Sequence, residues 1–285
     1  ENELERAALA ANQLARHYAK AVQALLAQTQ KQPEEVAAIG CHGQTVRHRP
    51  ELGFTLQLNN AALLAELSGI AVVADFRSRD IAAGGQGAPL VPAFHAAAFQ
   101  HPNIHRVIVN IGGIANLTDL PSNGKVGGFD CGPGNMLLDA WCNTHRGTVY
   151  DANGAWAASG KVIPALLDAM LREPYFQQRP PKSTGRDLFN RDWLQRFLRT
   201  EYAPQDVQAT LLKLTVHTIW QAIQDDCAGA QEIYVCGGGA RNGALINSLR
   251  HAFAQNATPV ALTDALGVAA EHVEALAFAW LARKA

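Results

Sequence analysis

The apolar positions in the first third of the chain alternate between helical and strand spacing. Over residues 4–28 they recur every three or four positions, which predicts an amphipathic helix that ends before Pro33. Apolar runs too short for a helix follow, separated by glycine and polar residues, and they predict buried strands. The elements predicted after the first helix are strands at 36–41, 55–58 and 70–74 and a helix at 61–67.

Polar side chains follow two of these predicted strands. His42 and Gln44 come directly after the strand at 36–41, and Asp75 and Arg77 come after the strand that ends at residue 74. In open α/β sheets ligands collect at the carboxyl ends of strands. The sequence therefore predicts one pocket that these four side chains line.

A second run of elements with the same order begins near residue 106. Residues 107–118 hold two apolar strands around Gly112 and Gly113, which predicts a tight β-hairpin. Such a turn can bring bare backbone N–H groups against a phosphate, or it can simply reverse the chain. The elements predicted after it are helices at 162–171, 207–223 and 244–253 and strands at 232–236 and 259–262.

Asp130 stands where a short strand at 127–129 is predicted to end. A Gly/Pro/Asn turn follows, and a helical pattern opens at Met136. A carboxylate beside the N–H groups of a helix start is well placed to act as a general base next to an anion, which indicates phosphoryl transfer. The structural alternative is that Asp130 caps the helix or orders the turn.

Composition excludes several classes of protein. A chain of 285 residues exceeds the size at which one core keeps growing, so we expect two domains and a cleft. The 24 basic and 25 acidic residues nearly cancel, which disfavours nucleic acid as a partner. Five widely spaced cysteines without a CxxC pair indicate reduced thiols in the cytoplasm, with neither disulfide nor zinc. No apolar run approaches the roughly 20 residues that span a membrane, so no membrane partner is expected.

The strand, glycine turn and helix at 232–253 also fit a nicotinamide dinucleotide site. Gly237 and Gly239 match the first two glycines of that motif, Asn242 stands where the third is expected, and Asp264 at the next strand end can hold a ribose. Such a protein has no need of the separate glycine hairpin earlier in the chain. The dinucleotide interpretation is therefore the weaker alternative.

Seven motifs, in this order, make the chain resemble the 1,6-anhydro-N-acetylmuramic acid kinase family. They are Cys41–Thr45, Ala74–Arg77, Gly84–Pro92, Asn110–Asn116, Phe129–Asn135, Lys182–Arg186 and Cys236–Asn242. The family belongs to the actin, Hsp70 and sugar kinase superfamily. The resemblance implies an α/β fold of two related actin-like ATPase (ribonuclease H-like) domains with an interdomain cleft. We expect these domains at 1–103 and 104–285, the second with a helical insertion at about 155–225.

The resemblance also implies a reaction and its site residues. In this family ATP, with Mg²⁺, phosphorylates O6 of the sugar while water opens the 1,6-anhydro bridge at C1, which gives N-acetylmuramic acid 6-phosphate for peptidoglycan recycling. The base carried over by motif is Asp130. Implied nucleotide contacts are Asn110, Gly112, Gly113, Gly237, Gly238 and Asn242. Implied amino-sugar contacts are His42, Gln44, Asp75, Arg77, Lys182 and Glu274, with Arg77 or Lys182 meeting the lactyl carboxylate and with a solvated helix position as the alternative for Glu274.

The chain departs from the family pattern at both ends, and at the C-terminal one family members continue past residue 285 with a Gly/Pro-containing tail. The family opens with a glycine hairpin that grips phosphates, and residue 1 of this chain already lies in the helix that follows it. We therefore expect the N-terminal part of the first domain to be missing. A truncated relative that binds the sugar without transferring phosphate is an alternative on this ground. The oligomeric state, a homodimer included, stays open.

Overall fold

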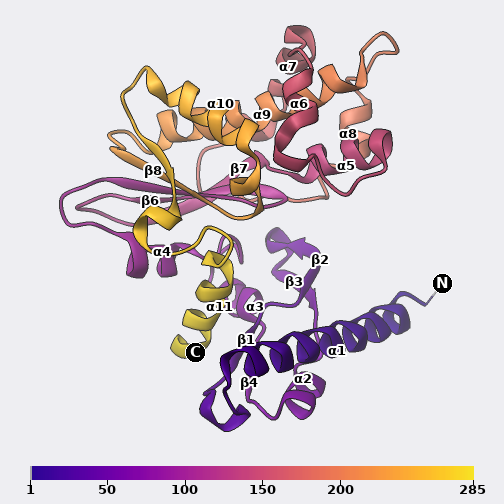
Figure 1. Ribbon diagram of the computed structural model, residues 1–285, viewed down its shortest axis with the longest axis vertical. Coiled ribbons are helices and arrows are strands. Elements are labelled where there is room, and N and C mark those ends of the chain that lie inside the picture. The colour runs from indigo at the N-terminus through magenta and orange to yellow at the C-terminus, as the bar shows by residue number, and fades with distance from the viewer. Residues whose placement is uncertain (1) are drawn as a thin grey trace. The chain divides into compact units, whose positions relative to one another are not determined.

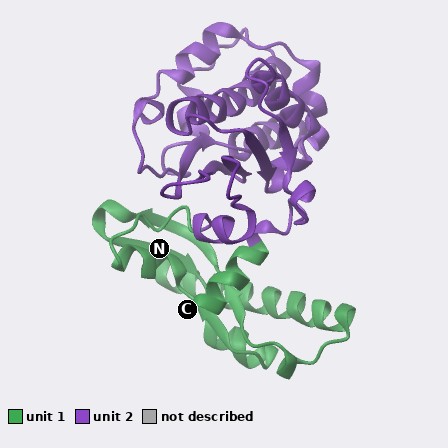
Figure 2. Ribbon diagram, turned by 90° about the vertical axis from the view of Figure 1, so that its left-hand side faces the viewer, with its two compact units in different colours: residues 1–90, 275–285 green, residues 91–274 purple. Residues whose placement is uncertain are grey.

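The computed structural model describes residues 2–285, which form two compact units (Figure 2). Unit 1 runs to Leu90 and includes Ala275–Ala285, and unit 2 is Val91–Glu274. The two units are defined by contacts between residues, whereas the predicted ranges of 1–103 and 104–285 are domains of related fold. These ranges stay a prediction.

Unit 1 is built around a long first helix. Asn2 caps this helix, because its side chain accepts a hydrogen bond from the backbone N–H of Glu5. Ala15 and Ala19 are buried with Leu64 in a small core, since small side chains let two helices approach closely. The helices of unit 1 are α1 (Glu3–Thr29), α2 (Ala61–Ser68), α3 (Phe76–Ala82) and the part of α11 (Val273–Lys284) from residue 275 on. Its strands are β1 (Ile39–Cys41), β2 (Gln44–Arg49), β3 (Phe54–Leu58) and β4 (Val72–Ala74).

The strands of unit 1 form two small sheets. β1 pairs in parallel with β4, and β2 pairs antiparallel with β3. Helix α11 lies close to β1, because a Cβ atom at Gly40 would overlap the carbonyl oxygen of Phe278. Gly40 therefore allows the C-terminal helix to pack directly on the backbone of β1.

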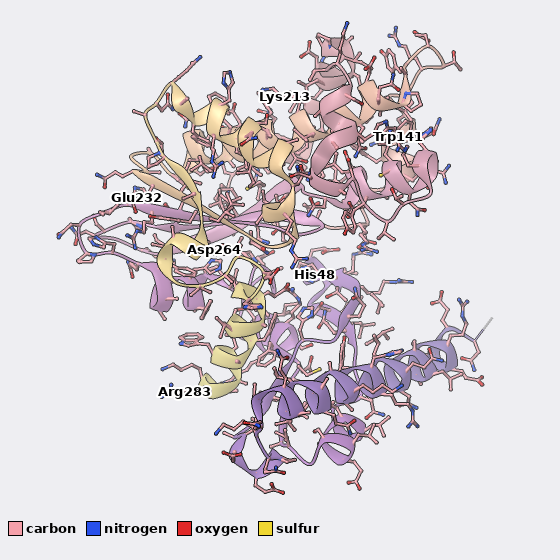
Figure 3. The ribbon with its side chains drawn as sticks, in the orientation of Figure 1. His48, Trp141, Lys213, Glu232, Asp264 and Arg283 are labelled. Atoms are coloured by element: carbon pink, nitrogen blue, oxygen red, sulfur yellow. The ribbon has the colours of Figure 1, made fainter. Side chains whose placement is uncertain are left out.

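Unit 2 contains a five-stranded sheet in the order β7-β6-β5-β8-β9 (Figure 1). The strands are β5 (Arg106–Ile111), β6 (Ile114–Leu120), β7 (Gly127–Pro133), β8 (Glu232–Cys236) and β9 (Val260–Leu262). β6 runs antiparallel to both β5 and β7, whereas β5, β8 and β9 run parallel to one another. Glu232, which opens β8 (Figure 3), forms an ion pair of 2.8 Å with Arg106 at the start of β5.

Helices cover both faces of this sheet. They are α4 (Pro92–Phe99), α5 (Met136–Arg146), α6 (Ala155–Ser159), α7 (Pro164–Leu171), α8 (Arg191–Gln195), α9 (Pro204–Asp226) and α10 (Gly243–Ala254). α9 packs on β6 and β7 from one side, and α4 packs on β6 from the other (Figure 1). Short 3-10 turns join them: η3 (Ala152–Gly154), η4 (Pro174–Gln177), η5 (Gly238–Arg241) and η6 (Thr263–Leu266).

Strand alternation assigns side chains to the two faces. Val109, Leu117 and Phe129 belong to the large core that α9 covers. Because successive side chains point to opposite faces, Asn110, Asn116 and Asp130 lie on the other face. His95 of α4 marks that second face, since its Nδ1 lies 2.8 Å from the hydroxyl of Thr118.

Most elements predicted from apolar spacing are confirmed. The helix predicted over 4–28 is α1, the hairpin around Gly112 and Gly113 is β5–β6, and the strand at 232–236 is β8. The strand predicted to end before Asp130 is wrong at its boundary, because β7 continues to Pro133. Pairing with β6 extends it, since this ladder tolerates a glycine and a proline at the strand end.

Three further local predictions differ from the structure. Residues 44 and 45, which follow the predicted strand at 36–41 and were not predicted in a strand, begin β2, because they pair with β3. Asp75 follows the end of β4 at Ala74 as predicted, but helix α3, which was not predicted, starts directly after it at Phe76. α4 was not predicted, since its nearly uniform apolar sequence gives no helical period.

None of the helices in the described part of the chain is both long and apolar enough to span a membrane.

Candidate active site

Asp130 occupies a β-bulge in β7. Asn116 pairs with Asp130 and Ala115 pairs with Gly132, so Cys131 is the extra residue between them. A bulge bends its strand and changes the direction of nearby side chains, and such bulges recur next to active sites. Asp130 is 4% exposed.

Three hydrogen bonds from other segments hold Asp130. The backbone N–H of Thr184 donates to Oδ2 at 2.9 Å. The backbone N–H of Asp130 donates to the carbonyl oxygen of Lys182 at 3.2 Å, and the Tyr175 hydroxyl donates to the carbonyl oxygen of Asp130 at 2.8 Å. Both the backbone and the carboxylate of Asp130 are therefore fixed in direction.

Lys182 lies on the face of the sheet opposite the Asp130 carboxylate. Its ammonium is 5.0 Å from the centre of the Tyr175 ring and 5.8 Å from that of Phe129, which belongs to the α9 core. It lines a polar cavity of about 180 Å³ together with His217, Thr218, Gln221, Asp225 and Asp226. Burial lowers the pKa of Lys182, and the two aspartates oppose that shift. The Lys182 ammonium and the Asp130 carboxylate therefore lie on opposite faces of β7, although the backbones of the two residues are hydrogen-bonded.

Three glycine-containing turns of unit 2 converge beyond the ends of β5 and β8. The turn after β7 donates to the hairpin turn, from Gly134 N to Gly113 O at 2.9 Å and from Asn135 N to Gly112 O at 2.8 Å. The turn after β8 reaches the same place, because a Cβ atom at Gly237 would overlap Oδ1 of Asn110. The predicted nucleotide contacts Asn110, Gly112, Gly113 and Gly237 therefore lie next to one another in unit 2.

Two of these glycines are not required by the fold itself. A Cβ atom at Gly113 would meet only Met136 Cβ at 3.7 Å, and one at Gly238 would meet only Asn135 Nδ2 at 3.8 Å. Both residues are exposed, and neither has a positive φ. The backbone N–H of Gly113 has no hydrogen-bond partner within residues 2–285. This turn presents a bare donor that a phosphate oxygen can approach.

Asn110 and Asn242 have structural contacts of their own. The thiol of Cys236 lies 3.8 Å from Oδ1 of Asn110, which turns the carbonyl end of this carboxamide towards β8. Asn242 caps α10, since its Oδ1 accepts from the backbone N–H of Leu245 at 3.0 Å. Asn242 is therefore committed to helix capping through this oxygen.

Unit 1 brings two of its four predicted polar residues together. Arg77 donates from Nε to Nε2 of His42 at 2.8 Å and from Nη1 to the carbonyl oxygen of Gly87 at 2.6 Å. Nδ1 of His42 then donates to the carbonyl oxygen of Gly43 at 2.7 Å. Burial and the neighbouring Arg77 lower the pKa of His42 to about 4, so its imidazole is neutral at pH 7.

The other predicted sugar residues are exposed. Asp75 precedes α3 with a left-handed backbone, φ 64° and ψ 32°, which is costly for a residue other than glycine. Gln44 begins β2, and its Nε2 donates only weakly to Thr45 at 3.4 Å. Glu274 stands in the first turn of α11, close enough to Cys236 for its charge to contribute to the raised pKa of that thiol. Strain of the kind seen at Asp75 is concentrated at functional sites.

Two residues that position Asp130 were not singled out from the sequence. Thr184 acts through its backbone N–H, and a backbone donor leaves no signature in residue type. Tyr175 lies in a 3-10 turn 45 residues away in the sequence, so only the tertiary fold brings its hydroxyl to β7. The Lys182–Arg186 motif was the available signal for the first of them.

Comparison with known proteins identifies close relatives. A family profile described as anhydro-N-acetylmuramic acid kinase matches residues 1–285. The anhydro-N-acetylmuramic acid kinase of Nitrosospira multiformis is 61% identical over 99% of this chain and 77% of its own length. The one of Nitrosomonas europaea is 58% identical over 100% of this chain and 78% of its own length.

Among solved structures the likeness is too low to carry an argument. The activator of the 2-hydroxyisocaproyl-CoA dehydratase from Clostridium difficile gives a TM-score of 0.44 at 15% identity, over 79% of this chain and 83% of that one.

These matches bear on three expectations. They give no support to the prediction that the first domain lacks its N-terminal part, since alignments over 99% or more of this chain and 77–78% of the relatives' length do not say what precedes it. They disfavour the truncated sugar-binding alternative. They also leave the dinucleotide interpretation without support, and Asp264 (Figure 3) accepts a hydrogen bond of 3.1 Å from the backbone of Ala270, which orders its own loop.

Proposed function

Because the chain belongs to the anhydro-N-acetylmuramic acid kinase family, we propose that Asp130 is the base of a coupled ring opening and phosphoryl transfer. The reactants are 1,6-anhydro-N-acetylmuramic acid, water and ATP, and the products are N-acetylmuramic acid 6-phosphate and ADP. The observation that carries the role of Asp130 is its buried carboxylate, held by the N–H of Thr184 in the same unit as the bare glycine turn.

One carboxylate accounts for both bond changes. Asp130 takes a proton from water, and the water oxygen forms a bond to C1 while the bond from C1 to O6 breaks. O6 leaves with the electron pair of that bond and attacks the γ-phosphorus, and the bond from phosphorus to ADP breaks. The proton stays on Asp130 until it is lost to solvent.

The glycine turns serve the phosphates. The N–H of Gly113 donates to a phosphate oxygen, and the missing side chains at Gly112 and Gly238 let the nucleotide approach the backbone. Asn110, Gly237 and Asn242 complete the proposed nucleotide contacts from the same converging turns. Preorganised donors of this kind stabilise the transferring group without reorganisation during the reaction.

Mg²⁺ enters this proposal as part of the Mg–ATP substrate. No group of three or more His, Cys, Asp or Glu side chains among residues 2–285 is arranged to hold a metal ion. Mg²⁺ commonly binds through substrate phosphates, waters and one or two carboxylates, so it does not need such a group. When bound with ATP it would offset the charge that develops on the phosphate oxygens.

We propose as sugar contacts His42, Gln44, Asp75 and Arg77 of unit 1 and Lys182 and Glu274 of unit 2. The hydrogen bond to neutral His42 orients the Arg77 guanidinium, which suits a lactyl carboxylate. We further propose that the two predicted domains are related actin-like folds. Five buried free thiols fit a cytoplasmic location, and a homodimer is the assembly to test first by light scattering.

The test of the base is Asp130→Asn. This variant keeps the shape of the side chain but cannot take the proton of water, so ADP release that depends on the anhydro-sugar falls by about 10²–10⁴-fold. Ring opening and phosphorylation are lost together, measured as reducing sugar and sugar phosphate in the same reaction. Asp187→Asn, at an exposed position, is the matched control and retains the parent rate. Undiminished turnover by Asp130→Asn rules out the proposed role.

A further inference from the structure

Asn116 lies in a row of polar residues across the central sheet. In the strand register Asn116 is directly opposite Asn110 on one side and Asp130 on the other. Residues directly opposite on antiparallel strands share a face and have Cβ atoms about 4.5–5.5 Å apart. Asn116 is therefore the side chain between the proposed base and a proposed nucleotide contact.

The carboxamide of Asn116 is unpartnered in the protein. Oδ1 is buried without a hydrogen bond, and within residues 2–285 no hydrogen bond is made by the amide nitrogen either. A buried amide oxygen without a hydrogen bond destabilises the folded protein, so it calls for an explanation. No protein contact holds either end of the group, and rotation by half a turn can present the oxygen or the nitrogen to the site.

The neighbours of Asn116 argue against a purely structural role. Thr118, two residues on and on the same face, is satisfied by His95. Ala115 and Leu117, on the other face, are fully buried in the apolar core. Among residues 115–118, Asn116 is the one whose polar side chain makes no hydrogen bond within the described protein.

We infer that Asn116 is a further catalytic residue, whose carboxamide oxygen accepts the second hydrogen of the water that Asp130 deprotonates. The inference rests on the proposed function of Asp130. A water with hydrogen bonds of about 2.8 Å to two acceptors holds them about 4.6 Å apart, which matches the spacing of side chains opposite each other in a ladder. With both hydrogens held, one lone pair of the water points at C1 of the sugar.

An amide suits this role better than a second carboxylate. Asn116 accepts a hydrogen bond but takes no proton, so the proton passes to Asp130 alone. A carboxylate at this position would face Asp130 as a like charge and would disfavour the ionised base. This difference supplies a test that a merely structural residue would fail.

The experiment compares Asn116→Ala and Asn116→Asp with the parent enzyme and with Asn123→Ala, an exposed matched control. We expect Asn116→Ala to lower kcat by about 10–100-fold, while KM for ATP and for the anhydro-sugar stays within about threefold. In Asn116→Asp the acid limb of the profile of kcat/KM against pH moves to higher pH by about one unit. Asn123→Ala matches the parent in each measurement.

Three outcomes overturn the inference. They are a kcat of Asn116→Ala within twofold of the parent, a rise of KM for ATP in proportion to the loss of rate, and an unmoved acid limb in Asn116→Asp. Asp130→Asn in the same assay separates the two proposals. If it is inactive while Asn116→Ala is fully active, only the role of Asn116 fails, and if both are active the proposed base fails as well.

Discussion

At the residue scale, the position of Asp130 depends on hydrogen bonds with three other residues. The hydroxyl of Tyr175 and the carbonyl oxygen of Lys182 each bond the backbone of Asp130, and the N–H of Thr184 bonds its side chain. General-base catalysis requires the base to lie within hydrogen-bond reach of the proton that it takes. A displacement of the β7 backbone would therefore reduce the rate even with the carboxylate intact.

Tyr175→Phe tests this dependence. The variant removes the donor to a buried carbonyl oxygen, which costs about 1–3 kcal/mol of the free energy of unfolding. We expect kcat to fall by about tenfold with little change in KM, because the base is displaced while the binding groups stay. Steady-state kinetics and urea unfolding measure the two effects. Tyr150→Phe, at a side chain 63% exposed, is the control, and an unchanged kcat in folded Tyr175→Phe would show that the hydroxyl does not position the base.

At the element scale, the two glycine turns contain one glycine that the fold requires, Gly237, and one that only the proposed function requires, Gly113. Gly237→Ala should lower the free energy of unfolding by about 1–3 kcal/mol, because φ is 82° there and the new Cβ atom overlaps Asn110. Gly113→Ala should leave the melting temperature unchanged and raise KM for ATP by about tenfold, since its methyl group stands where the phosphate approaches. Thermal unfolding and ATP kinetics of the two variants check this. A Gly113→Ala enzyme with the parent KM would place the nucleotide elsewhere.

Some elements could be predicted from local sequence spacing, and others depend on distant parts of the chain. Elements with a strong period or a paired glycine turn, such as α1 and the β5–β6 hairpin, follow from local spacing alone. The end of β7 and the start of β2 depend on partner strands far along the chain, so local patterns misplace them. Asp130 was found because a turn and a helix start follow it, whereas its partners Tyr175 and Thr184 come from distant segments. The motif that contains Lys182 does not indicate the face of β7 on which this side chain packs, because that is a tertiary property.

At the scale of the whole molecule, one buried and two half-buried titratable groups couple folding to pH. Burial lowers the pKa of His42 to about 4 and that of His95 to about 3, whereas burial raises the pKa of Asp139 to about 6. Below pH 6.5 both histidines are protonated in the unfolded chain but stay neutral in the native protein until the pH approaches their lowered pKa values. Each histidine therefore makes the free energy of unfolding fall as pH falls, by about 1.4 kcal/mol per pH unit at most. Asp139 acts in the opposite sense between pH 6 and 3.8, because the native carboxyl is protonated first.

The net expectation is a loss of stability on acidification from pH 6.5 to 4, in which the two histidines outweigh one carboxyl. His42→Gln removes one of the two sites that bind a proton in the unfolded chain only. The dependence of the free energy of unfolding on pH should therefore become shallower by up to about 1.4 kcal/mol per unit across this window. Urea unfolding at pH 7, 6 and 5 measures it. His251→Gln, at an exposed position, is the matched control and should keep the parent slope. Equal slopes for His42→Gln and the parent would mean that His42 is protonated in the native protein as readily as in the unfolded chain, and its hydrogen bond from Arg77 could not then persist at mildly acid pH.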